Sequence, residues 1–126
     1  MKVLIIDNER HSREAVKLLV NWRTYGIKEI FEASDTLSAE KITIDKRPNL
    51  ILSDMERSDE NSLPFLLWVS FNFPETSIII TTGHIELSVI KIMKNLIGVI
   101  NKPVDQKLIN EMIAIAVSEF PKNEIQ

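Results

Sequence analysis

The chain has 126 residues, 44% of them hydrophobic and 26% charged, with a formal net charge of −3 and no cysteine. This length predicts one domain with a real buried core, and the charge shows no basic bias for binding nucleic acid. The lack of cysteine excludes a disulfide framework and a thiolate metal site. No apolar stretch approaches membrane-spanning length or forms a signal peptide, so we expect a cytoplasmic protein.

Five runs rich in Val, Ile and Leu follow one another along the chain. They lie near residues 2–6, 27–32, 49–53, 77–81 and 97–101. Because these runs are nearly continuous rather than alternating, they indicate strands buried on both faces, as in a parallel sheet.

Amphipathic stretches separate the strand-like runs and predict helices. An early one has a helical apolar stripe at Ala15, Leu18, Leu19 and Trp22. Ser62 can cap a helix that has Pro64 in its first turn. In the last stretch Asp105 is placed as the N-cap, and the apolar stripe is Leu108, Ile109, Met112, Ile113 and Ala116.

This alternation predicts an α/β fold, a single flavodoxin-like (βα)₅ doubly wound parallel sheet with strand order 2-1-3-4-5. That order places the first and third strands side by side. The second strand, expected from Ile27 to Glu32, delivers no obvious polar group to a pocket.

Each of the other four strands delivers a polar side chain at its carboxyl end: Asp7, Asp54, Thr82 and Lys102. In an open parallel sheet, ligands bind just outside those ends. We therefore expect a pocket with two carboxylates, a hydroxyl and an ammonium group, and with Asp54 at its centre.

These groups suit phosphoryl transfer. Asp7, Asn8, Glu9 and Asp54 offer the hard oxygen ligands that Mg²⁺ prefers. A carboxylate can also accept a phosphoryl group as a nucleophile. The metal and the lysine ammonium would neutralise the transferred charge, and the Thr82 hydroxyl could donate to a phosphoryl oxygen.

The set Ile6-Asp7-Asn8-Glu9, Asp54, Thr82-Gly83 and Lys102-Pro103 resembles the receiver domain of two-component response regulators over roughly residues 1–120. The resemblance implies that Asp54 is the phosphoacceptor, charged by a sensor histidine kinase. It makes Asp7, Asn8, Asp54 and the backbone carbonyl of Glu56 ligands of Mg²⁺. Thr82 becomes the switch hydroxyl, and Lys102 contacts the phosphoryl group. Such a receiver is no enzyme beyond self-phosphorylation and slow autodephosphorylation.

Residues 21–27 resemble the corresponding segment of AraC-type regulators of Firmicutes, in which a helix-turn-helix domain follows the receiver. The resemblance implies the amino-terminal part of a transcription factor. Residues 121–126 would be a tail or the start of a linker, and DNA would be bound only through a C-terminal domain outside these 126 residues.

The chain departs from the family pattern at several positions. Asn8 replaces the usual second Asp, and one charge lost at ~3 Å costs on the order of several kcal/mol before water compensates, which weakens metal binding. The loop after Asp54 lacks the usual Met-Pro pair and Gly, for which Asn61 can stand in. Val99 replaces the aromatic switch residue, and the stretch from Thr82 to Lys102 is about two residues short, which predicts a clipped fourth helix.

Two other functions stay open from the residues. One is a degenerate, non-phosphorylated receiver that acts as an interaction or dimerisation module. The other is a small Mg-dependent aspartyl phosphatase of the haloacid-dehalogenase class, although Asp7 lacks the second Asp that this class needs two positions later. Apolar residues in excess of one core-facing stripe predict a homodimer surface in the fourth-helix region: Leu87, Val89, Ile90, Ile92, Met93 and Leu96.

Overall fold

The computed structural model describes residues 1–55, 62–82 and 92–119. Its strands are β1 (Lys2–Ile6), β2 (Glu29–Ala33), β3 (Leu50–Asp54), β4 (Ser77–Thr82) and β5 (Leu96–Asn101). Its helices are α1 (Arg10–Leu19), the short 3₁₀ helix η1 (Trp22–Tyr25), α2 (Thr36–Lys46), α3 (Leu63–Asn72) and α5 (Gln106–Ser118). All strands pair in parallel in the order β2-β1-β3-β4-β5, which confirms the predicted topology.

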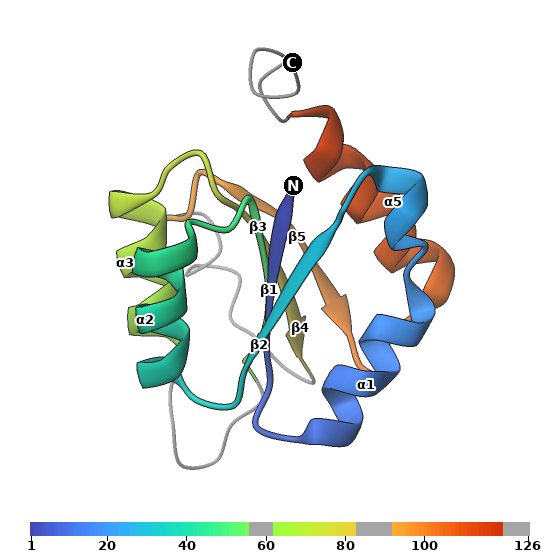
Figure 1. Ribbon diagram of the computed structural model, residues 1–126, viewed down its shortest axis with the longest axis horizontal. Coiled ribbons are helices and arrows are strands. Elements are labelled where there is room, and N and C mark those ends of the chain that lie inside the picture. Colours follow the sequence, from blue (N-terminus) through green and yellow to red (C-terminus); the bar gives the residue numbers. More distant parts are fainter. Residues whose placement is uncertain (56–61, 83–91, 120–126) are drawn as a thin grey trace.

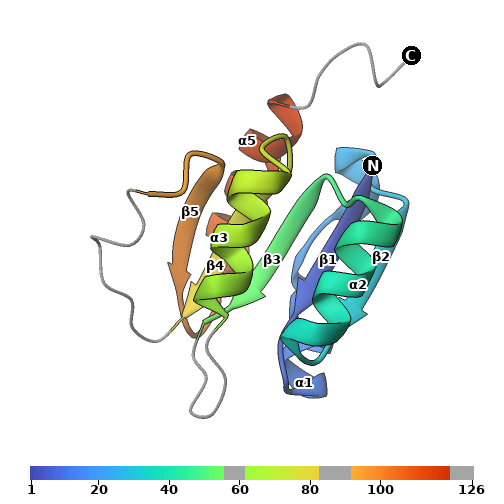
Figure 2. The same cartoon turned by 90° about the vertical axis from the view of Figure 1, so that its left-hand side faces the viewer.

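Helices cover both faces of this sheet. Helices α2 and α3 lie on one face and α1 and α5 on the other (Figure 1), and Figure 2 shows the α2–α3 face. Successive strand residues point to opposite faces. In β1, Val3 and Ile5 join the core beneath α5, whereas Leu4 and Ile6 join the core beneath α3. Burial on both faces explains why the strand sequences are continuously apolar.

The apolar stripe predicted for the first helix is right at Leu19 and Trp22 and wrong at Ala15 and Leu18. Leu18 is 84% exposed and Ala15 is also exposed, whereas Val16 and Leu19 pack against the core. Helix α1 ends at Leu19, because the backbone becomes extended at Val20. Trp22 therefore belongs to η1, although it still packs against the core as a half-buried residue.

The second strand begins at Glu29, two residues later than predicted. Gly26 adopts a left-handed conformation with φ of 71° and ends η1. The N–H of Ile27 then donates to the carbonyl of Trp22 at 3.1 Å, and its side chain is buried in the core. Ile27 is thus apolar because it packs at the end of η1, not because it pairs within the sheet.

Helix capping matches the prediction for α5 but not for α3. The Asp105 carboxylate accepts a hydrogen bond from the N–H of Leu108 at 2.8 Å, so it caps α5 as expected. Ser62 occupies the N-cap position of α3, but its side chain makes no capping hydrogen bond. The predicted clipped fourth helix falls largely on residues 83–91, outside the described residues. Within the described ranges, no helix is long and apolar enough to cross a membrane.

Candidate functional site

The fold brings the predicted strand-end residues to one edge of the sheet. Asp7 follows β1, Asp54 and Thr82 are the last residues of β3 and β4, and Lys102 follows β5. Because the strands are parallel, these four residues share the carboxyl edge. Asp54 and Asp7 are only 2% and 5% exposed, and Thr82 is fully buried.

Lys102 connects the two carboxylates. Its Nζ lies 3.1 Å from Oδ1 of Asp54 and 3.5 Å from Oδ2 of Asp7. Burial by itself lowers the pKa of Lys102, but the hydrogen bond and charge of Asp54, followed by those of Asp7, outweigh burial and raise it. Lys102 therefore carries its positive charge at neutral pH and compensates two buried acids.

A backbone hydrogen bond holds Lys102 beside the fourth strand. Its N–H donates to the carbonyl of Thr82 at 2.9 Å, one residue beyond the end of β5. The N–H of Met55 donates to the carbonyl of Thr81 at 3.0 Å, so β3 and β4 also stay paired up to the site. The peptide bond between Lys102 and Pro103 is cis.

Asp7 is oriented by its own neighbours. Its N–H donates to the carbonyl of Ala33 at 3.1 Å, and its Oδ1 accepts from the N–H of Glu9 at 2.9 Å. With Oδ1 bonded to the backbone, Oδ2 is the oxygen that faces Lys102. The turn after β1 thus directs one carboxylate oxygen of Asp7 into the site.

The predicted metal ligands are only partly brought together. Asp7 and Asp54 converge, whereas the side chains of Asn8 and Glu9 are exposed and Glu56 lies outside the described residues. In the described ranges there is no cluster of three or more His, Cys, Asp or Glu residues that could hold a metal. Two buried carboxylates at one edge nevertheless fit Mg²⁺, which commonly takes one or two carboxylates and completes its shell with water and phosphate oxygens.

Ser62 has a role that the sequence did not reveal. Its buried hydroxyl donates to the backbone carbonyl of Asp54 at 3.1 Å instead of capping α3. This bond links the two described ends of the loop after β3 and fixes the peptide that carries Asp54. The only sequence signal for it is a serine placed just before an apolar helix, which a capping role explains equally well.

The remaining predicted residues have different surroundings. Val99 is half-buried against the core on the α2–α3 side. Gly83 and the apolar residues 87, 89 and 90 fall outside the described residues. Of the other three residues in the predicted dimer surface, Ile92 is 55% exposed, Met93 is buried and Leu96 is half-buried.

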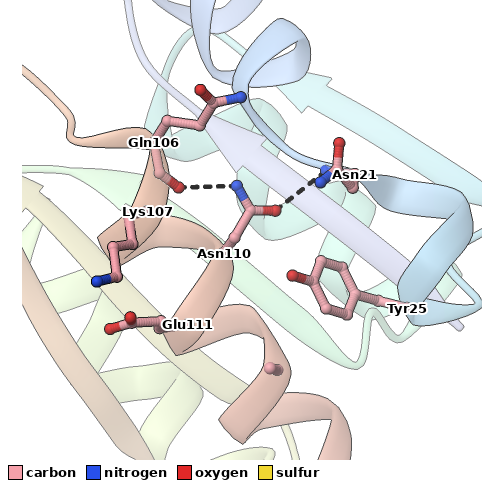
Figure 3. A pocket seen from close by; sticks show the side chains of 7 residues that line it. Asn21, Tyr25, Gln106, Lys107, Asn110 and Glu111 are labelled. Atoms are coloured by element: carbon pink, nitrogen blue, oxygen red, sulfur yellow. Dashed lines mark hydrogen bonds between the residues drawn. The ribbon is translucent and has the colours of Figure 1, made fainter.

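A hollow lies between η1 and α5 (Figure 3). Its main polar contacts come from Asn110, whose amide nitrogen donates to the carbonyls of Gln106 at 2.7 Å and Leu19 at 2.9 Å. The amide oxygen of Asn110 accepts from the N–H of Asn21 at 3.1 Å. None of the four strand-end residues lines this hollow, and the Asn110 bonds serve to fasten α5 to the end of α1.

Comparisons with known proteins show the family of this chain. The family model for the response regulator receiver domain matches residues 3–114. The sensory transduction protein LytR of Streptococcus agalactiae is 29% identical over 111 residues, covering 87% of this chain and 45% of LytR. The transcriptional regulatory protein HptR of Staphylococcus aureus is 24% identical over 127 aligned positions, covering 99% of this chain and 50% of HptR.

A solved structure shows the same fold. A two-component transcriptional regulator AraC from Clostridium phytofermentans has a TM-score of 0.82 at 20% identity, over 94% of this chain and 93% of that one. The chain spans about half the length of the curated relatives it matches. Because the family model matches most of the sequence, this chain belongs to the response regulator receiver domains of two-component systems.

Proposed function

We propose that Asp54 accepts a phosphoryl group from a sensor histidine kinase and that this modification is the signal the domain transmits. The observation that carries the proposal is the position of Lys102, whose ammonium lies within 3.1 Å of Asp54 and 3.5 Å of Asp7. A fixed positive charge at that point suits a site where negative charge arrives, because preorganised charges contribute strongly in a water-poor setting.

In the reaction, an oxygen of the Asp54 carboxylate attacks the phosphorus and forms the new O–P bond. The bond between phosphorus and its leaving group breaks, and that group, a kinase imidazole or acetate, leaves with the electron pair. Lys102 compensates the charge on the phosphoryl oxygens, and the Thr82 hydroxyl donates to one of them. Asp7 and Asp54 each bring a carboxylate that repels the incoming phosphoryl oxygens, so positive charge at the site is needed to offset that repulsion.

Mg²⁺ would be held by Asp7 and Asp54, together with the backbone carbonyl of Glu56 and the Asn8 amide. When bound, it would supply a divalent positive charge to the phosphoryl oxygens. The neutral, exposed Asn8 adds no charge to this set, so we expect weaker metal binding than with two acids there.

A relative supports a proposal for the output of the domain. HptR is a transcriptional regulatory protein about twice as long as the matched segment. We accordingly propose a receiver over residues 1–120, a tail or linker at 121–126 and a DNA-binding domain beyond it, with a cytoplasmic location. A homodimer through the fourth-helix region would couple phosphorylation to DNA binding, since exposed apolar side chains such as Ile92 suit a partner surface.

A second function is a receiver that works without phosphate, as an interaction module. Two observations favour it. The Asn8 side chain beside the proposed metal site is exposed and uncharged, and a half-buried Val99 stands in place of an aromatic ring. Titration with Mg²⁺ distinguishes the two functions. Saturable binding in the millimolar range supports the phosphorylated receiver, and absence of binding supports the interaction module.

The direct test is intact-mass spectrometry after incubation with acetyl phosphate and Mg²⁺. The wild-type chain should gain the mass of one phosphoryl group, and Asp54→Asn should gain none. Asp35→Asn is the matched control, because Asp35 is an exposed aspartate whose carboxylate caps α2. If wild type stays unmodified, or if Asp54→Asn is modified to the same extent, the proposal is wrong.

A further inference from the structure

Strand β2 carries an acid near its carboxyl end that contacts helix α1. Glu32, the penultimate residue of β2, accepts hydrogen bonds from two cations of α1. Nε of Arg13 lies 2.9 Å from Oε1 of Glu32, and Nζ of Lys17 lies 2.9 Å from Oε2. Both oxygens of Glu32 are therefore held by α1, and the end of β2 is fastened to that helix.

Arg13 extends this contact to the candidate site. Its Nη1 donates to the backbone carbonyl of Asp7 at 2.6 Å while its Nε is bonded to Glu32. The guanidinium side chain is only 15% exposed. A planar fork with several N–H groups can bind two acceptors at once, whereas a lysine ammonium on a flexible stem fixes no such geometry. Arg13 thus connects the carboxylate of Glu32 to the residue that follows β1.

Together these contacts restrain Asp7 at three points. Its N–H is bonded to Ala33, its carbonyl to Arg13 and its Oδ1 to the N–H of Glu9. Two of these restraints come from neighbouring residues of β2, since Ala33 acts directly and Glu32 acts through Arg13. The backbone orientation at Asp7 determines where its Cβ points, and hence where Oδ2 lies relative to Lys102.

We propose that Arg13 and Glu32 are positioning residues for Asp7, holding its carboxylate in the orientation that binds a divalent cation. The inference rests on the proposed function in that it assigns Asp7 to the metal site. Groups that hydrogen-bond around a metal ligand orient it, and their loss typically lowers metal affinity by about 10- to 100-fold. Neither residue touches the phosphoryl group, so both act only through Asp7.

The test compares two substitutions that each remove one negative charge from the same cluster. Glu32→Gln weakens the anchor of Arg13. Glu14→Gln is the matched control, because the Glu14 carboxylate pairs with Lys17 at 2.9 Å. Arg13→Lys is a second test variant, because it keeps the positive charge at that position and removes the planar guanidinium group. Metal affinity is measured with Mn²⁺ by the electron paramagnetic resonance signal of the free ion.

A second readout follows Asp7 without any metal. The amide proton of Glu9 is bonded to Oδ1 of Asp7, so its NMR chemical shift reports the position of that carboxylate. In Glu32→Gln and Arg13→Lys we expect about tenfold weaker Mn²⁺ binding and an upfield move of the Glu9 amide proton. Glu14→Gln should keep the wild-type affinity and shift, and the rest of the amide spectrum shows whether each variant is folded.

The two readouts separate the inference from the proposed function. If wild type binds no Mn²⁺, the proposed metal site fails, and the Glu9 amide shift alone then decides whether Arg13 and Glu32 orient Asp7. If the Glu9 amide stays at its wild-type position in both folded variants, the inference is overturned. An equal loss of affinity in Glu14→Gln and Glu32→Gln would also overturn it, since general charge would then explain the effect.

Discussion

Replacing Lys102 with methionine tests whether the ammonium compensates the two buried acids. At an effective dielectric of about 20, a unit charge attracts each carboxylate at these distances by about 5 kcal/mol. Desolvation of Lys102 and repulsion between the two acids offset much of that attraction. Breaking a buried ion pair costs ~3–5 kcal/mol, and the 26% exposure of the Lys102 side chain favours the lower end. We expect Lys102→Met to lower the free energy of unfolding by about 3 kcal/mol.

The assay is urea denaturation followed by tryptophan fluorescence, since the half-buried Trp22 and Trp68 report on the two cores. Adding Asp7→Asn to Lys102→Met should restore part of the loss, because one of the two uncompensated charges is then removed. The pKa of Lys102 is raised, so its stabilising effect is fully present below the ordinary value of 10.5 and is lost as pH rises through the folded value. A Lys102→Met variant as stable as wild type at neutral pH would refute this reasoning.

Three further substitutions test individual contacts. Ser62→Ala removes the donor to the buried carbonyl of Asp54 and should lower the free energy of unfolding in urea by about 1 kcal/mol. It should also slow the modification of Asp54 by acetyl phosphate. An unchanged rate of modification would show that Ser62 only stabilises the fold. Gly98→Ala places a Cβ at 2.7 Å from Cε of Met112 and should lower the free energy of unfolding by about 1 kcal/mol. The same substitution should cost less in a chain that already carries Met112→Ala, because the side chain that it meets is then shorter. Asp105→Ala removes the cap of α5 and should lower the unfolding free energy by about 1 kcal/mol, and an effect below a few tenths would contradict the capping role.

The sheet was predictable because its evidence is local to each strand. Continuous apolar runs indicated buried parallel strands, and the order 2-1-3-4-5 brought Asp7 beside Asp54 as expected. Lys102 was expected near both acids for the same reason, because all three residues lie at the carboxyl edge of the sheet. Elements whose boundaries depend on tertiary contacts were harder to predict from the sequence. Ile27 is a residue type typical of strands, but its N–H bonds to Trp22 of η1 and the pairing of β2 with β1 begins at Glu29.

Other features depended on choices that the sequence leaves open. Consecutive apolar residues at the end of α1 fit two helical stripes, and burial selects the one that contains Val16 and Leu19 and leaves Leu18 in solvent. The pairing of Arg13 with Glu32 joins residues 19 positions apart. An acid at the end of a strand next to β1 was a usable signal, but no spacing rule identifies which cation it meets.

The central claim, that Asp54 carries the phosphoryl group, is tested most directly by locating the modification. After incubation with acetyl phosphate and Mg²⁺, borohydride reduces an aspartyl phosphate to homoserine, which peptide sequencing by tandem mass spectrometry assigns to one position. The account predicts homoserine at position 54, and none in a sample incubated without acetyl phosphate. Reduction at another aspartate, or no reduction in a sample that has gained a phosphoryl group, would contradict the account.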